Sequence, residues 1–275
     1  MIAPRDALEA IGQLPDAEID IADAAVQLAR VDAPEADWQA ACAALSDLAR
    51  EAASMAREGG AETCTGRAKA LARLLVARHG FRGDTESYDD PANANLIRVL
   101  QRRRGLPVAL GVLWLHASQA AGWPAHGIDF PAHFLVGVAG RGAPVPIDVF
   151  DGGETLDAAG LHRLLVRFEG PAAVLRPGLL RPMSTRAVLL RLQNNILSRR
   201  GQADDLTGAL ACAENMLRIA PEQSDIWWQA AQMNRRLDRV AAALRCFERY
   251  LALVPEGAAA GRARAAVASL RGRLN

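Results

Sequence analysis

The sequence has little lysine and no excess of either charge. Lys69 is the only lysine among 32 basic residues, and 31 acidic residues leave a formal net charge of +1. Proteins that bind nucleic acids concentrate positive charge, and anionic membranes attract clusters of basic residues. We therefore expect neither a nucleic acid nor a membrane as partner. The preference for arginine and alanine is typical of a GC-rich bacterial genome.

Paired cysteines and export signals are also lacking. The four cysteines are scattered, without a CxxC pair, which is typical of reduced thiols in the cytosol. Residues 1–21 carry several acidic side chains and have neither the basic start nor the apolar run of a signal peptide. The apolar stretch 108–121 is shorter than the about 20 residues that cross a bilayer. These absences predict a soluble, cytoplasmic protein.

The hydrophobic spacing predicts an α+β chain that is mostly helical, in three parts. Residues 1–60 have the spacing of alanine-rich helices, and we expect this segment to pack on the core. The core, 61–182, contains a buried helix that begins at Pro107, where the missing N–H costs nothing. Residues 186–275 have the pattern of helices only.

Two polar residues follow the buried helix on neighbouring predicted strands. His133 lies on a strand that starts near residue 132, and Asp148 lies on the returning strand after a turn at 140–143. An antiparallel pair brings them within reach, as in sites where a carboxylate orients an imidazole. The alternative is that the two groups satisfy each other in the core.

Other candidate site residues lie earlier in the chain. Cys64 opens a predicted helix over 64–79, where the helix dipole could lower the pKa of its thiol. The alternative is a small packing residue. Arg102, Arg103 and Arg104 are adjacent and could bind an anionic ligand or partner, or form a solvated turn.

The C-terminal helices repeat with a period of 34 residues, the period of tetratricopeptide repeats. The matched pairs are Pro221 and Pro255, Ala209 and Ala243, Leu210 and Leu244, Leu217 and Leu251, and Asp204 and Asp238. Trp227 falls at an expected place in the second copy. We expect about two repeats and a capping helix over 258–274. Such arrays bind peptides, which makes Trp227 a candidate binding residue.

The order of these features resembles the transglutaminase-like core, a papain-like arrangement of Cys, His and Asp. The stretches RRRGLPVALGVLWL, FPAHFLV and IDVFDGG, followed by the repeats, resemble the bacterial SirB-type subfamily most closely. The resemblance implies a central helix with a small antiparallel sheet, and His133 and Asp148 as the catalytic pair. Counting back from Gly122, the position of the family's nucleophilic Cys falls on Pro107. The same domain occurs in some F-box proteins, which suggests recognition roles.

Because Pro107 has no nucleophile, we favour a catalytically inactive protein that binds a protein or peptide as a scaffold or regulatory module through its repeats. The alternative is a cysteine-type hydrolase or acyltransferase in which Cys64, as a displaced nucleophile, works with His133 and Asp148. A Cys64 sulfur far from the His133 ring would exclude it.

A third hypothesis is a metal site made by His133 and Asp148 with Asp129 or Asp151. No paired ligand spacing supports it, so we expect no metal and no cofactor. The sequence leaves the partner's identity and the oligomeric state open.

Overall fold

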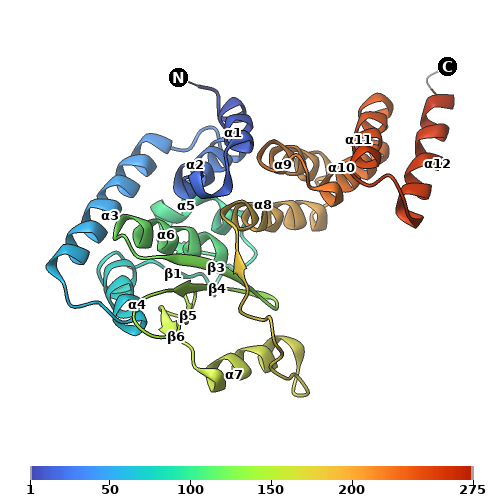
Figure 1. Cartoon of the computed structure of the whole chain (residues 1–275). Coiled ribbons are helices and arrows are strands. Elements are labelled where there is room, and N and C mark those ends of the chain that lie inside the picture. The colour runs from blue at the N-terminus through green and yellow to red at the C-terminus, as the bar shows by residue number, and fades with distance from the viewer. Residues whose placement is uncertain (1, 274–275) are drawn as a thin grey trace. The chain divides into compact units, whose positions relative to one another are not determined.

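The computed structural model describes residues 2–273, which form two compact units (Figure 1). The larger unit comprises residues 15–192. The smaller unit combines residues 2–14 with residues 193–273. The chain is mostly helical with one small antiparallel sheet, so the predicted fold class is confirmed. Within the described residues, no helix is both long and apolar enough to span a bilayer.

The larger unit is built around α6, Pro107–Ala120, which is buried on nearly all sides and has proline at its first position, as predicted. A Cβ atom at Gly111 would lie 2.1 Å from the Phe134 ring, so helix and sheet pack too closely there for a side chain. The other helical segments are α2 (Ile21–Asp32), α3 (Trp38–Glu58), α4 (Cys64–Ala72), α5 (Leu96–Arg102), α7 (Ala158–Glu169), two 3-10 turns (Asp16–Glu18, Pro91–Ala94) and a π-helical segment (Arg73–Arg78) that continues α4.

The sheet lies between α6 and α7, which cover its opposite faces (Figure 1). Its strand order is β6-β5-β4-β3-β7, with antiparallel neighbours throughout. The strands are β3 (Ala125–Phe130), β4 (His133–Val138), β5 (Val145–Asp148), β6 (Glu154–Thr155) and β7 (Pro182–Met183), while β1 (Arg82–Gly83) and β2 (Arg104–Gly105) form a separate parallel ribbon. His133 begins β4 and Asp148 ends β5, so both lie at the open end of the β4–β5 hairpin.

The sequence prediction placed only two strands here and missed β3. A tight turn at Pro131 and Ala132 reverses the chain between β3 and β4, and Ala132 adopts a left-handed conformation with φ of 53°. Alanine gives no sign of such a conformation, because non-glycine residues rarely adopt it.

The smaller unit contains the repeat helices. Ala231 and Ala243 are fully buried beside Phe247, as expected of small residues at tight helix crossings. Val267 and Leu270 complete this cluster from the last helix, which therefore caps the array. Its helices are α1 (Pro4–Gln13), α9 (Leu206–Ile219), α10 (Ser224–Arg236), α11 (Val240–Leu253) and α12 (Ala258–Gly272), and α8 (Thr185–Gln202) continues into it from the larger unit.

The first 60 residues are divided differently from the sequence prediction. Helices α2 and α3 pack on α6, but α1 belongs to the smaller unit and packs against α9. Leu8 and Ile11 are buried there, and Glu9 pairs with Arg218 at 3.5 Å. Periodicity shows that α1 has an apolar face, but it does not show which surface that face covers.

Candidate functional site

The strongest candidate site is the buried pair of His133 and Asp148, each 6% exposed. His133 Nε2 lies 2.9 Å from Asp148 Oδ1. The same oxygen accepts the backbone N–H groups of Phe150 at 3.0 Å and Asp151 at 3.2 Å, which fixes the carboxylate. An ionised carboxylate only accepts hydrogen bonds, so in this contact the imidazole Nε2 is the donor. The expected His–Asp contact is thus present.

Aromatic rings surround the imidazole. Phe168 from the end of α7 stacks on His133 with 5.5 Å between ring centroids, and Phe150 meets the imidazole edge-on at 6.2 Å. Tyr88 in turn meets Phe150 edge-on at 5.8 Å. Arg191 of α8 donates to the His133 carbonyl at 2.8 Å. These contacts hold the ring in one orientation.

Within residues 2–273, no thiol or hydroxyl hydrogen-bonds His133 or Asp148. Pro107 is buried at the start of α6 and offers neither a side-chain nucleophile nor an N–H. Within the described residues, the imidazole is therefore oriented by a carboxylate and has no thiol or hydroxyl group hydrogen-bonded to it.

Cys64 does not supply the missing thiol, which corrects the displaced-nucleophile hypothesis. Its sulfur lies 3.5 Å from the carbonyl oxygen of Arg141 and 3.6 Å from that of Gly142, in the turn that joins β4 to β5. His133 lies at the other end of β4, which has six residues and is therefore about 17 Å long. Cys64 is instead a buried packing residue.

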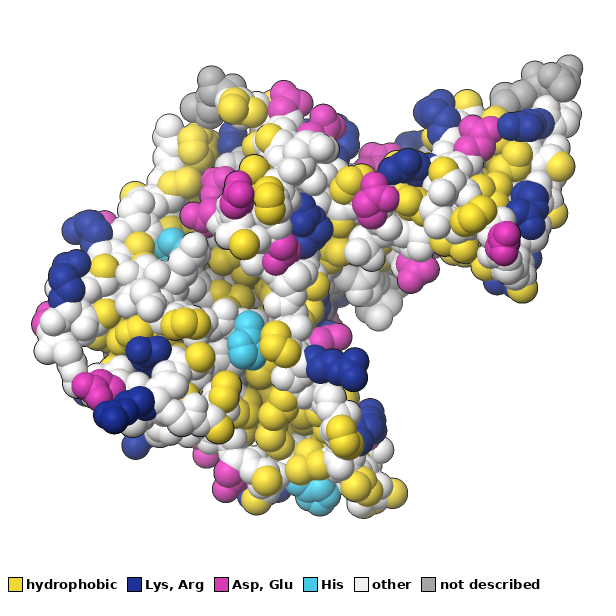
Figure 2. Space-filling view, viewed as in Figure 1, with side chains coloured by type: hydrophobic (Ala, Val, Ile, Leu, Met, Phe, Trp, Pro, Cys, Tyr) yellow, Lys and Arg dark blue, Asp and Glu magenta, His cyan; other side chains and the backbone are white. Residues whose placement is uncertain are grey.

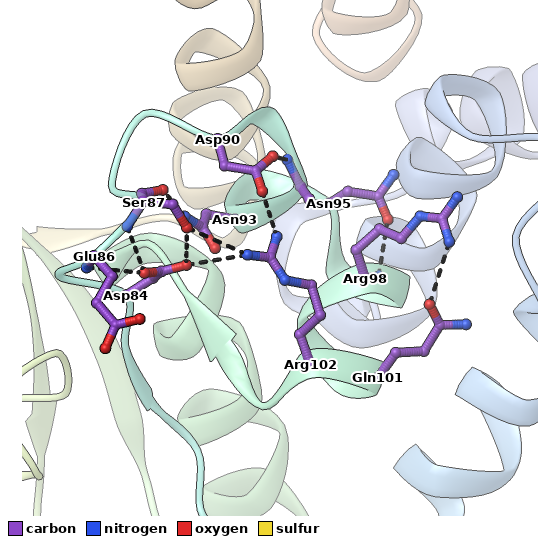
Figure 3. Close-up of polar contacts among 10 residues, drawn as sticks. Asp84, Glu86, Ser87, Asp90, Asn93, Asn95, Arg98, Gln101 and Arg102 are labelled. Carbon is purple, nitrogen blue, oxygen red and sulfur yellow. Dashed lines mark hydrogen bonds and ion pairs between the residues drawn. The ribbon is translucent and has the colours of Figure 1, made fainter.

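Arg102 is already engaged within the larger unit, as Figure 3 shows. Its guanidinium donates to Asp84 at 3.1 Å and to Asp90 at 2.8 Å. Asp84 is buried and also accepts the backbone N–H of Glu86 and the backbone N–H and hydroxyl of Ser87. The pKa of Asp84 is lowered, chiefly by the backbone hydrogen bond from Ser87.

The three arginines therefore do not form one clamp. Arg102 holds the loop 84–95, Arg103 ends α5 in a left-handed conformation with φ of 56°, and Arg104 lies in β2. A binding role for Arg103 or Arg104 stays a prediction.

The structure offers no support for the metal hypothesis. In the described part of the chain, no group of three or more His, Cys, Asp or Glu side chains is placed to hold an ion. Asp129 forms an ion pair with Arg191.

Trp227 lines a groove of about 620 Å³ within the smaller unit. Its indole N–H donates to the Pro221 carbonyl at 2.8 Å, which fixes the ring. Residues of α11 form another wall of the groove. One of them is Cys246, and burial raises the pKa of its thiol. Sequence reasoning missed Glu9 and Gln13 of α1, which also line the groove, because only the tertiary packing brings α1 beside α9.

Comparison with known families agrees with this architecture. Residues 39–194 match the transglutaminase-like superfamily, and residues 196–268 match the tetratricopeptide repeat. The chain belongs to the transglutaminase-like superfamily. The predicted resemblance, a transglutaminase-like domain followed by repeats, is confirmed.

The relatives of this transglutaminase-like protein include SirB-type bacterial proteins. A UPF0162 protein of Xylella fastidiosa is 31% identical over 189 residues, covering 68% of this chain and 67% of the relative. One from Pseudomonas aeruginosa is 29% identical over 254 residues, covering 91% and 90%. Mouse F-box only protein 21 is 28% identical over 132 residues, covering 47% of this chain but only 21% of that protein.

Proposed function

We propose that this protein is a catalytically inactive transglutaminase-like protein that binds a protein or peptide through its helical repeats, as a scaffold or regulatory module. The observation that carries the proposal is the absence of a thiol at the His133–Asp148 pair. Pro107 stands at the position that the family resemblance assigns to the nucleophile, and Cys64 lies at the far end of the β4–β5 hairpin. In an inactive protein, the His133–Asp148 hydrogen bond serves to hold the open end of the β4–β5 hairpin together.

The repeat groove supports the binding half of the proposal. Residues spaced by three, four and seven positions on α9, α10 and α11 converge on it, so three helices present one side each. Pro221 and Trp227, both partly exposed, supply apolar surface, and Arg245 supplies an exposed charge. Apolar surface bordered by charge is typical of peptide-binding grooves.

Inactivity is tested with the purified full chain, using glutamine-containing peptides and activated acyl esters as substrates. We expect turnover no faster than that of the His133→Ala variant. Turnover that is lost in His133→Ala and retained in Cys64→Ala would refute inactivity and place the nucleophile elsewhere.

Binding is tested with two variants of the same helix. Ala242 lines the groove, whereas the adjacent Ala241 is exposed and lies outside it. Affinity capture from bacterial cytosol should recover a partner with wild type and with Ala241→Arg, and lose it with Ala242→Arg. Equal capture by both variants would place binding outside the groove. These point variants are preferable to removing the repeats, because truncation would also uncover α1.

We also propose a cytoplasmic location. None of the four cysteines, all of which lie within the described residues, forms a disulfide bond, which fits a reducing compartment. Fractionation of cells that carry a tagged full chain tests this, and recovery in the periplasmic fraction would contradict it.

A further inference from the structure

Exposed apolar side chains are concentrated in one short segment of the transglutaminase-like core. Phe168, Val174, Leu175 and Leu180 are 39%, 71%, 36% and 40% exposed, and they account for four of the seven large hydrophobic residues described as exposed. Figure 2 shows hydrophobic side chains gathered at the lower end of the view, where Figure 1 places α7 and the loop after it. Concentrated apolar surface of this kind is typical of interaction sites.

The loop after α7 is held in place with Val174, Leu175 and Leu180 outward. His162 Nε2 lies 3.2 Å from the Ala173 carbonyl oxygen, and Arg176 donates two hydrogen bonds to Glu169, at 2.9 and 3.1 Å. These two anchors lay the loop along α7. Leu179 packs against the cluster between α7 and the sheet. The exposure of Val174 and Leu175 is therefore a property of an anchored loop.

The same segment is basic. Residues 158–181 contain four arginines and one glutamate, which gives a net charge of +3 in a chain whose total is +1. The glutamate and Arg176 pair with each other. Arg163 and Arg167 are exposed one turn apart on α7, and the Arg167 guanidinium lies 5.7 Å from the centre of the Phe168 ring. Arg167 thus borders Phe168, and Arg163 lies one turn before it on the same helix.

We propose that this surface, made of Phe168, Val174, Leu175 and Leu180 with Arg163 and Arg167, docks an acidic peptide segment of a partner protein that carries large apolar side chains. The apolar side chains would cover Val174 and Phe168, and flanking carboxylates would pair with the arginines. This surface lies on the core, so the proposal is independent of the repeat groove.

A peptide fits this surface better than an anionic membrane does. The exposed acidic residue Asp151 is connected to Phe168 by a chain of contacts. Its backbone N–H donates to Asp148, Asp148 bonds the His133 ring, and Phe168 stacks on that ring. A flat anionic bilayer that reached Phe168 would also meet this charge. A peptide can place its carboxylates toward α7 and away from Asp151.

The test uses the full chain and a short fluorescent peptide with a Leu-Phe core flanked by glutamates. We expect saturable binding that weakens with added salt. The Arg163→Gln, Arg167→Gln double variant should bind about five- to tenfold more weakly, because exposed ion pairs stabilise a complex only modestly. Val174→Ser with Leu175→Ser should also weaken binding. Both sets are exposed, and circular dichroism verifies folding.

Matched controls separate this surface from other charged surfaces. Arg50→Gln with Arg57→Gln, both exposed on α3, should bind the peptide like wild type. Bound peptide should also shift the His133 imidazole NMR signals through the stacked Phe168 ring.

Three results would overturn the proposal. One is equal affinity for a peptide with lysines in place of the glutamates. Another is equal loss of binding in the α3 control. The third is binding to phosphatidylserine vesicles without binding to the acidic peptide, which would identify a membrane surface.

Discussion

Replacing Asp84 by asparagine should destabilise the larger unit. The carboxylate accepts the backbone N–H groups of Glu86 at 3.1 Å and Ser87 at 2.9 Å, the Ser87 hydroxyl at 2.8 Å and the Arg102 guanidinium at 3.1 Å (Figure 3). Asparagine has nearly the same shape but only one acceptor oxygen. Its amide NH2 group is a hydrogen-bond donor and would face two other donors, the Arg102 guanidinium and the Ser87 hydroxyl.

We expect the free energy of unfolding at neutral pH to fall by about 2 to 3 kcal/mol. Hydrogen bonds to a buried charged group contribute about 1.5 to 3 kcal/mol. The pair with Arg102 adds at most about 1 kcal/mol, because the arginine is partly exposed and its charge is screened.

The loss of stability in Asp84→Asn should become smaller as the pH falls. The pKa of Asp84 in the folded protein is lowered from 3.8, so folding favours the ionised form. Its contribution is complete above the unfolded pKa and is lost as the pH falls through the lowered folded pKa. Wild type and Asp84→Asn should therefore differ most near neutral pH and converge in acid.

Urea unfolding at a series of pH values measures this difference, with Glu86→Gln as the control because Glu86 is exposed on the same loop. Hydrogen exchange of the Asp84 amide, which donates to the Gly105 carbonyl at 3.3 Å, reports local opening. A difference that stays constant down to acidic pH, or a Glu86→Gln effect of equal size, would refute the reasoning.

Three further changes should lower stability. Phe247→Ala removes a fully buried ring from the repeat cluster and should cost about 3 to 5 kcal/mol in unfolding of the smaller unit. Leu8→Ala should cost about 2 to 4 kcal/mol in the same unit, because Leu8 is buried in the helix that packs on α9. Gly111→Val should cost about 1 to 3 kcal/mol or more by overpacking against Phe134, measured as a lower Tm of the larger unit.

For each of these three substitutions, one outcome would contradict the expected loss of stability. Unchanged thermal unfolding of Leu8→Ala would mean that α1 does not stabilise the repeats. A Gly111→Val protein as stable as wild type would mean that α6 moves away from the sheet without cost. A small loss in Phe247→Ala would mean that the repeat cluster closes around the cavity.

Much of the candidate site could be predicted locally. The start of α6 at Pro107 follows from a proline whose absent N–H needs no partner. The reach between His133 and Asp148 follows from two short strands and a turn, since the pairing of a hairpin is nearly fixed by the chain itself. The 34-residue repeat likewise follows from spacing, because each repeat packs mainly on its neighbours.

The features that could be predicted from the sequence are short-range: the central helix, the hairpin that carries the His–Asp pair, and the repeats. Three long-range features could not be predicted in this way: Cys64 packs against the hairpin turn, Asp84 and Asp90 bind Arg102, and α1 covers α9. The physical reason is that hydrophobic and charged side chains have many suitable partners in a chain of this length. Packing chooses among them, and sequence spacing does not record that choice.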